Sequence, residues 1–293
     1  MRIIIPNDIK SEFNGYNYII AWFNKYKYTE NTEITFDFGL VTFFEANLCA
    51  VIGTVFEMLE SRNNKISIQN IKPQVETILR KNEFLLPFGF DKIIDLYDTS
   101  LKYRKFTPND DAGFNEYIKS ELLKKPKFPS HSEKLGKKIT RNIFEIYENA
   151  RTHGKCDFIH TCGQFYPKKP DKPLHFTIVD KGVNIKENVS LYLQKDLDAS
   201  EAIVWAMQKG NTTKTGSTSG GLGLAVIFEF VKLNRGKIQV ISSDGFYEFK
   251  NDIVVTKKLS AAFEGTIINL KFNLNDSNHY ILSDEEQYFE NIF

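Results

Sequence analysis

Residues 145–154 read Glu145-Ile146-Tyr147-Glu148-Asn149-Ala150-Arg151-Thr152-His153-Gly154. Residues four positions apart lie on one face of a helix, so Glu145 and Asn149 project side by side. Apolar residues recur at the helical period on the opposite face: Ile139, Ile143, Ile146 and Ala150. The pattern therefore predicts an amphipathic helix whose apolar face packs into a core.

The polar face of this helix carries a carboxylate beside a carboxamide. Glu145 can act as a base that activates water, while Asn149 offers a neutral oxygen ligand for Mg2+, which keeps several waters and takes few protein ligands. Glu148 lies one step round the helix and is an alternative base. An ordinary surface helix has the same pattern, so the motif needs support from the rest of the chain.

A second motif follows a predicted strand. The run from Leu174 to Val179 alternates and is rich in β-branched and aromatic residues, which predicts a strand that ends at Asp180. An acid at a strand end followed by Gly182 places a hydrogen-bond acceptor where a ligand can approach bare backbone. The alternative is an ordinary turn, in which Asp-x-Gly is common.

A third motif is a polar loop that opens a helix. Residues 210–219 have almost no apolar content, which predicts a loop, and Gly221-Leu222-Gly223-Leu224 then leads into the helical run from Ala225 to Val231. Backbone amides at such a helix start form an anion site suited to phosphates, and Lys214 would add a point charge. The alternative is a flexible linker before a core helix.

Other phosphate-binding motifs are absent from the sequence. The chain has no Gly-x-x-x-x-Gly-Lys-Ser/Thr, and no Gly-x-Gly-x-x-Gly follows a strand. These absences exclude a P-loop and a dinucleotide fingerprint, and the protein-kinase motifs are missing as well.

In their order and spacing, the motifs between residues 115 and 275 resemble the Bergerat-fold (histidine kinase-like, GHKL) ATPases. This superfamily includes gyrase, the ninety-kilodalton heat-shock chaperone, histidine kinases and the MutL proteins. The resemblance implies an α/β sandwich over residues 114–276, in which helices cover one face of a mixed sheet. It also implies that the chain binds ATP and Mg2+.

The resemblance assigns a role to each matching residue. Glu145 would be the general base, Asn149 would hold Mg2+, Asp180 would accept the adenine amino group, and Gly182 would let adenine lie close. Thr266, on the predicted strand from Gly265 to Leu270, resembles the residue that joins the water network around Asp180. The other candidate nucleotide ligands are Asn184, Thr213, Lys214, Gly221, Leu222, Gly223 and Leu224.

The sequence departs from the family at Asn184, which stands where the second glycine of Asp-x-Gly-x-Gly is expected. Among the residues other than glycine, asparagine best tolerates the left-handed conformation, so we expect the turn to be kept. The helix motif Glu-x-x-x-Asn-Ala-x-x-His-Gly resembles the anti-sigma serine-kinase branch more than the sensor histidine kinases. We expect His153 to be structural.

The first ninety residues follow a different pattern. Predicted strands and helices alternate, with strands near 33–38 and 65–71 and helices at 47–61 and 73–81, which indicates a small α/β unit. Residues 30–90 resemble a STAS domain, the fold of anti-anti-sigma factors, so we assign 1–90 to a STAS-like interaction domain. The stretch aligned with its phospho-acceptor, Glu45-Ala46-Asn47-Leu48, has no hydroxyl, which argues against phosphorylation there.

Residues 91–113 are predicted to be a linker, and 277–293 a C-terminal tail. The fold class is therefore α+β, a STAS-like α/β domain followed by the sandwich. A net charge of +1 gives no indication of nucleic-acid binding, and no apolar run is long enough for a membrane span. We expect a cytoplasmic protein with reduced cysteines.

Together these patterns predict an ATP-binding regulatory protein with slow ATP hydrolysis. Closure of the loop at residues 210–220 over the nucleotide would control binding of a protein partner, and a homodimer is possible. One alternative is a protein serine/threonine kinase of the anti-sigma type. Another is a non-enzymatic STAS-like interaction protein with a degenerate ATPase domain.

Overall fold

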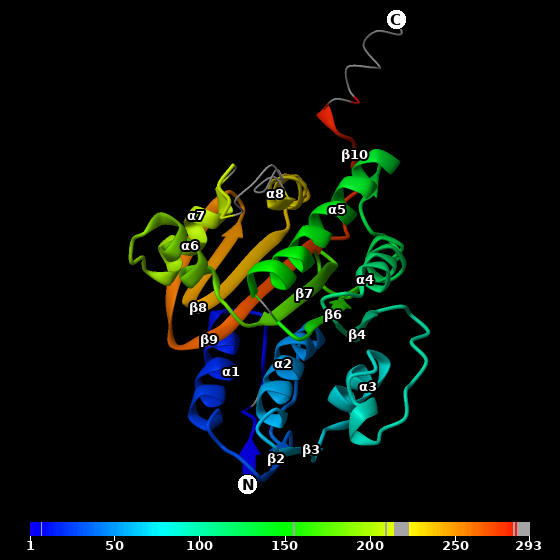
Figure 1. Ribbon diagram of the computed structural model, residues 1–293. Coiled ribbons are helices and arrows are strands. Elements are labelled where there is room, and N and C mark those ends of the chain that lie inside the picture. The colour runs from blue at the N-terminus through cyan, green and yellow to red at the C-terminus, as the bar shows by residue number, and fades with distance from the viewer. Residues whose placement is uncertain (7, 155, 209, 214–222, 284, 286–293) are drawn as a thin grey trace, which may run out of the picture.

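The computed structural model describes residues 1–6, 8–154, 156–208, 210–213, 223–283 and 285. Its centre is a five-stranded sheet with helices on both sides, and a smaller three-stranded sheet lies near the N-terminus (Figure 1). The fold class is α+β, as predicted, and the arrangement is consistent with an α/β sandwich.

The five-stranded sheet is antiparallel between all of its described neighbours. Its strands, in spatial order, are β4 (Ser100–Phe106), β6 (Ile159–Phe165), β7 (Pro173–Lys181), β9 (Ile253–Asn273) and β8 (Lys237–Lys250). We expected a mixed sheet, and for two of the four neighbouring pairs the difference has a simple cause. Short connections join β6 to β7 and β8 to β9, and strands joined by a short turn must run in opposite directions.

One face of this sheet packs against the helices that carry the predicted site. These are α4 (Asp111–Tyr117), the π-helical Ile118–Leu123, α5 (Glu133–Asn149), the π-helical Ala150–Gly154, α6 (Ile185–Leu193), α7 (Ala199–Met207) and α8 (Gly223–Leu233). The predicted apolar face of α5 is buried, with Ile139 and Ile143 fully inaccessible to solvent. They share a core with Ile227 of α8 and Phe176 of β7.

The N-terminal unit alternates strands and helices, as the sequence predicted. A parallel sheet in the order β1-β2-β3 is formed by β1 (Arg2–Ile4), β2 (Glu33–Asp37) and β3 (Lys65–Gln69). Its helices are α1 (Phe13–Tyr26), the 3-10 turn Ala46–Leu48, α2 (Cys49–Glu60), α3 (Pro73–Lys81) and the 3-10 turn Leu86–Phe88. Proline at the first position of α3 fixes a backbone angle suited to a helix start.

The second face of the large sheet is covered by the N-terminal unit. Cys162 of β6, Val179 of β7 and Phe263 of β9 belong to the same buried cluster as Phe56 of α2 and Phe23 of α1. The helices within residues 114–276 lie on one face, as expected, but the sequence did not predict that the N-terminal unit covers the other face. Period-two patterns in the strands show which residues alternate, but they do not show that both faces are buried.

A layer of buried polar side chains lies within this second contact. Asn47 donates to Ser11 Oγ at 2.7 Å and to Thr177 Oγ1 on β7 at 2.9 Å. Asn269 on β9 donates to Gln239 Oε1 on β8 at 2.8 Å. Asn47 lies in the stretch aligned with the STAS phospho-acceptor, so that stretch is buried against the sheet.

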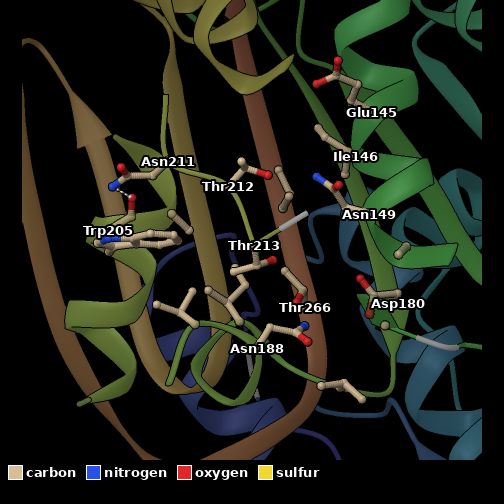
Figure 2. Close-up of a pocket in the computed structure, with 17 residues that line it drawn as sticks. Glu145, Ile146, Asn149, Asp180, Asn188, Trp205, Asn211, Thr212, Thr213 and Thr266 are labelled. Atoms are coloured by element: carbon tan, nitrogen blue, oxygen red, sulfur yellow. Dashed lines mark hydrogen bonds between the residues drawn. The ribbon is translucent and has the colours of Figure 1, made fainter. Parts of the chain in front are cut away.

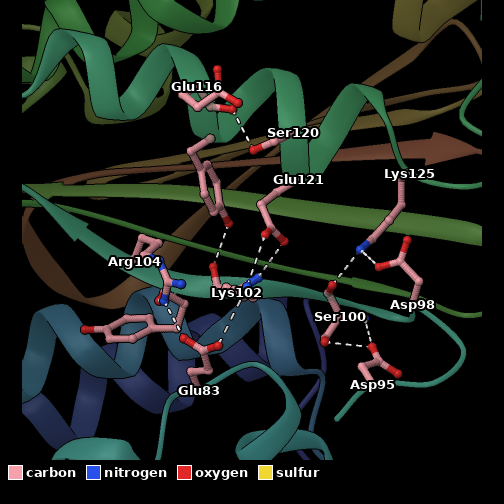
Figure 3. A network of polar contacts seen from close by, with 12 residues as sticks. Glu83, Asp95, Asp98, Ser100, Lys102, Arg104, Glu116, Ser120, Glu121 and Lys125 are labelled. Carbon is pink, nitrogen blue, oxygen red and sulfur yellow. Dashed lines mark hydrogen bonds and ion pairs between the residues drawn. The ribbon is translucent and has the colours of Figure 1, made fainter. Parts of the chain in front are cut away.

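The range 91–113, which we expected to be a linker, contains β4, an edge strand of the large sheet. Polar contacts hold this range in place on both sides (Figure 3). Arg104 pairs with Glu83 at 2.8 Å, Lys125 donates to the Ser100 carbonyl at 2.7 Å, and Asp95 accepts from the Ser100 amide at 2.7 Å. The boundaries of the two predicted units themselves stay a prediction.

A small two-stranded sheet pairs β5 (Ser130–His131) with β10 (His279–Tyr280). Part of the predicted C-terminal tail is therefore paired with the segment before α5. Among the described residues, no helix is long and apolar enough to cross a membrane.

Gly53 lies on α2 where the N-terminal unit packs against Tyr103 of β4, so a substitution there measures how tight this contact is. A Cβ at this position would lie 2.2 Å from Tyr103 Oη, which is held by a 2.8 Å hydrogen bond to His160 Nδ1. Alanine normally stabilises a helix by about 1 kcal/mol over glycine. Here we expect Gly53→Ala to lower the free energy of unfolding by roughly 1–3 kcal/mol, because the core is overpacked.

Urea unfolding would measure this change. The control is Glu60→Ala, at an exposed position of the same helix, which should change the stability by less than about 0.5 kcal/mol. Equal stability of Gly53→Ala and the wild type would show that Tyr103 can move aside.

Candidate functional site

A pocket of about 150 Å3 opens between α5, the end of β7, β9 and the α6–α7 pair. Five of the predicted site residues line it together: Glu145, Asn149, Asp180, Thr213 and Thr266. Figure 2 shows Glu145, Asn149 and Asp180 on one side of the pocket, Trp205 opposite and Thr266 between them. Segments that are far apart in the sequence thus converge on one cavity, in the combination that the motifs predicted.

Asp180 is the most unusual group in this pocket. Its side chain is buried, with 8% of the residue exposed, and its Oδ1 has no hydrogen-bond partner within the described part of the chain. Burial raises the pKa of the Asp180 carboxyl from 3.8 to about 7, against a smaller lowering by the backbone amide of Thr266. A buried acceptor without a partner is unfavourable, so a ligand that donates a hydrogen bond to it would be bound more tightly.

Glu145 and Asn149 lie one helical turn apart on α5, half-buried and both on the pocket wall. The helix is anchored at its start by Ser132, whose side chain accepts from the Leu135 amide at 3.1 Å. Glu148, the alternative base, does not line this pocket and instead pairs with Arg151 at 2.6 Å. The geometry therefore favours Glu145.

The end of α5 reaches Asp180 through close backbone contacts. After Asn149 the chain continues as a π-helix to Gly154, and a Cβ on Gly154 would lie 2.9 Å from Asp180 Oδ1. Gly182 has a φ of 138°, and a Cβ there would lie 1.8 Å from the Gly154 carbonyl oxygen. Gly182 is not among the pocket-lining residues, so the visible reason for glycine here is this contact between backbones.

The backbone at Asn184 does not form the left-handed turn that we expected. Asn184 has a φ of −85°, so it is extended rather than left-handed, and it caps α6. Its Oδ1 accepts from the Glu187 amide at 3.0 Å, and its Nδ2 donates to Glu187 Oε1 at 2.6 Å. Asparagine is among the best N-cap residues, which explains its presence where the family has glycine.

Thr266 lies opposite Asp180 on the neighbouring strand β9. Its hydroxyl is 3.1 Å from Ser242 Oγ, which donates to the Gly265 carbonyl at 2.9 Å and accepts from the Ile185 amide at 2.9 Å. Ser242 thus connects the start of α6 to the floor of the pocket. The sequence did not single out this serine.

Three of the predicted phosphate ligands, Lys214, Gly221 and Leu222, lie outside the described residues. Gly223 and Leu224 form the start of α8, so the predicted helix begins as expected. Thr213 lines the pocket. Their proposed contacts with phosphate stay a prediction.

Sequence reasoning missed the wall formed by α6 and α7. Trp205, Asn188 and Asn211 line the pocket from this side. The Asn211 side chain donates to the Trp205 carbonyl at 2.9 Å, which fixes the chain just before Thr213. A signal was present in the sequence, because Asp198 and Glu201 form a capping box that marks the start of α7.

The donor set bears on which metal the pocket can hold. Within the described ranges, no group of three or more His, Cys, Asp or Glu residues could hold an ion. A single amide oxygen from Asn149 fits Mg2+, which is commonly bound through one or two protein groups together with waters and substrate phosphates.

No protein-family model matches this sequence, and no curated protein matches it. One similar solved structure is the histidine kinase domain of the blue-light activated histidine kinase EL346 from Erythrobacter litoralis, with 13% identity and a TM-score of 0.26, covering 70% of this chain and 77% of that one. Another is the topoisomerase IV ATP binding domain of Francisella tularensis in complex with a small-molecule inhibitor, with 12% identity and a TM-score of 0.26. That match covers 64% of this chain and 47% of the other. Identities and TM-scores this low carry no information about function, which must therefore be inferred from the pocket.

The raised pKa of Asp180 predicts a pH-dependent stability. The folded protein holds this proton more tightly than the unfolded chain, so the stabilisation is complete below about pH 4 and is lost as the pH rises through 7. Asparagine cannot ionise. Without nucleotide, Asp180→Asn should therefore gain stability relative to the wild type between pH 5 and 8, by on the order of 3 kcal/mol.

Urea unfolding at several pH values would measure this difference. Asp196→Asn is the control, because the Asp196 side chain is 92% exposed and stays hydrated on folding. A stability difference for Asp180→Asn that does not change with pH would mean that the Asp180 carboxylate is already satisfied in the folded protein.

Proposed function

We propose that this chain is an ATP-binding regulatory protein that binds ATP with Mg2+ in the pocket described above and hydrolyses it slowly. The observation that carries the proposal is the buried carboxylate of Asp180, with one oxygen lacking a partner in the described structure. The resemblance of the motifs to the Bergerat-fold ATPases adds support.

The recognition of adenine would rest on Asp180. Adenine carries an exocyclic amino group, a donor that can satisfy the free Oδ1, whereas guanine has a carbonyl oxygen at the same ring position. When Asp180 is ionised, placing that oxygen against the buried carboxylate would bring two acceptors together without a proton between them. The pocket therefore favours adenine over guanine. Thr266, beside Asp180, would help to hold the ring in place.

The phosphate end of the nucleotide would lie toward Glu145 and Asn149. Asn149 would supply the protein oxygen for Mg2+, and the metal would neutralise part of the phosphate charge. Glu145, one turn away on the same side of α5, would accept a proton from the attacking water and orient it. Thr213 and the amides at the start of α8 would contact the phosphates.

A regulatory role is supported by the covered second face of the sheet. The N-terminal unit, which we propose to be STAS-like, is packed on the strands that carry Asp180 and Thr266. A protein partner that binds this unit would therefore touch a structure continuous with the nucleotide site. We place the protein in the cytoplasm, where ATP and Mg2+ are available.

Two substitutions separate binding from turnover. Asp180→Asn should weaken ATP binding in calorimetry by about a hundredfold or more, because it removes the charge and replaces one of the two acceptor oxygens with an NH2 group that cannot accept from adenine. Glu145→Ala should bind ATP almost normally but lose hydrolysis by a factor of roughly 100 to 10,000. Calorimetry and phosphate release measure the two effects.

The matched control is Glu148→Ala, three residues after Glu145 on the same helix. This substitution removes a carboxylate that pairs with Arg151. It should keep both affinity and turnover. If Glu145→Ala hydrolyses ATP as fast as the wild type, the assignment of the base is wrong. If labelled γ-phosphate appears on a protein rather than in solution, the chain is a kinase.

Intrinsic fluorescence offers a second test, because the chain has two tryptophans. Trp205 lines the pocket, whereas Trp22 is buried in the N-terminal unit with 6% exposed. Adding ATP should change the emission of the wild type and of Trp22→Phe. The change should vanish in Trp205→Phe, although calorimetry still detects binding. A signal that is lost in Trp22→Phe instead would place the nucleotide elsewhere.

A further inference from the structure

The first six residues of β9, 253–258, form an exposed segment with a free edge in the described structure. All six residues from Ile253 to Lys258 are exposed, and among the described residues they pair on one side only, with β8. Ile253 is 63% exposed and Val254 is 49% exposed. Isoleucine, valine and threonine favour strands, and an exposed apolar strand with a free edge is a template for pairing with another strand.

The register of the hairpin determines which backbone groups are available. Lys250 and Ile253 are partners on either side of a two-residue turn, in which Asn251 and Asp252 have φ values of 51° and 61°. In such a hairpin the pair next to the turn shares its backbone hydrogen bonds, and the direction then alternates along the strand. The backbone groups of Val254 and of Thr256 therefore point away from β8.

The protein covers the same free side further along the strand. Asn17 of α1 accepts from the Ser260 amide at 2.7 Å, and Asn24 of α1 donates to the Ala262 carbonyl at 2.7 Å. In the described part of the chain, no side chain forms a corresponding bond to the backbone of Val254 or Thr256. The uncovered stretch is therefore limited to the outer part of the hairpin.

We propose that this stretch pairs with the same stretch of a second copy of the chain, in an antiparallel dimer centred on Val255. This register places Val255 opposite itself and Val254 opposite Thr256. The central pair would then be a non-hydrogen-bonded one, and each Val254–Thr256 pair would exchange two backbone hydrogen bonds. The backbone N–H and C=O groups of Val254 and Thr256 point away from β8, as these hydrogen bonds require.

Charge supports a second copy rather than an unrelated strand. In the same register Asp252 lies opposite Lys258, and this pair occurs twice because of the symmetry. Lysines on an edge usually discourage pairing, but opposite an aspartate they favour it. Within one chain the same side chains form exposed ion pairs, Asp252 with Lys232 at 3.0 Å and Lys258 with Asp244 at 3.3 Å.

The mass in solution tests the proposal without reference to nucleotide. Light scattering or sedimentation over a wide concentration range should show exchange between a 33.8 kDa monomer and a dimer of twice that mass. Val254→Pro removes the outward N–H and should leave only monomer. The pairing with β8 uses Ile253 and Val255, so the melting temperature should stay close to that of the wild type. The control Val254→Thr keeps the N–H and should still dimerise.

A charge exchange tests the register. Asp252→Lys and Lys258→Asp should each weaken the dimer about tenfold, since like charges then face each other twice. The double substitution should restore it. Both ion pairs within the chain are lost in the double variant, so only pairing between copies explains a recovery. A wild type that stays monomeric, a dimer that survives Val254→Pro, or a double variant as weak as the singles would overturn the proposal.

Discussion

The site depends on the burial of one carboxylate at a point where three backbone segments meet without side chains. Gly154 passes beside Asp180 Oδ1, Gly182 passes beside the Gly154 carbonyl, and Gly265 on β9 lies so close that a Cβ would be 2.1 Å from the Asp180 carbonyl oxygen. Gly182 and Gly265 also have φ values of 138° and 150°, which other residues rarely adopt. The close approach of these backbone segments is compatible with the burial of Asp180, and that burial raises the pKa of its carboxyl. The resulting acceptor is formed before any ligand arrives, which lowers the cost of ordering the site on binding.

The large sheet holds Asp180 in a fixed position because both faces of the sheet are buried. One face holds α5 and α8, and the other holds α1 and α2 through a mixed layer of apolar and hydrogen-bonded polar side chains. Asn47 binds Thr177 on β7, three residues before Asp180. Lys181, the residue after Asp180, pairs with Glu57 of α2 at 3.3 Å. The strand that carries the acceptor is thus held from the N-terminal unit on both sides of the site, and its position is set by packing rather than by a loop.

Much of the site could be predicted because each motif depends on local geometry. The helical period of α5 places Glu145 and Asn149 together, and the alternation of β7 ends at Asp180. The antiparallel order of the sheet, the cover on its second face and the strand β4 within the expected linker are set by contacts between distant segments. Asn184 shows a further limit, since the same residue suits a left-handed turn and a helix cap, and only the backbone around it decides between them. Trp205 went unnoticed because a single aromatic residue in an amphipathic helix usually serves the core.

Helix α7 connects the pocket around Asp180 to the exposed strand. Trp205 lines the pocket and also an outer groove, and Thr256 of β9 lines the same groove from the other side. Ser200, near the start of α7, donates to the Lys257 carbonyl at 3.3 Å. A ligand that moves Trp205 therefore acts on a helix that touches the strand proposed to pair with a second copy. Linkage makes any such effect reciprocal: if nucleotide changes the dimerisation constant by some factor, dimerisation changes the affinity for nucleotide by the same factor. Any coupling between the two sites would run through this helix of nine residues, and the factor by which the affinities change would give its free energy.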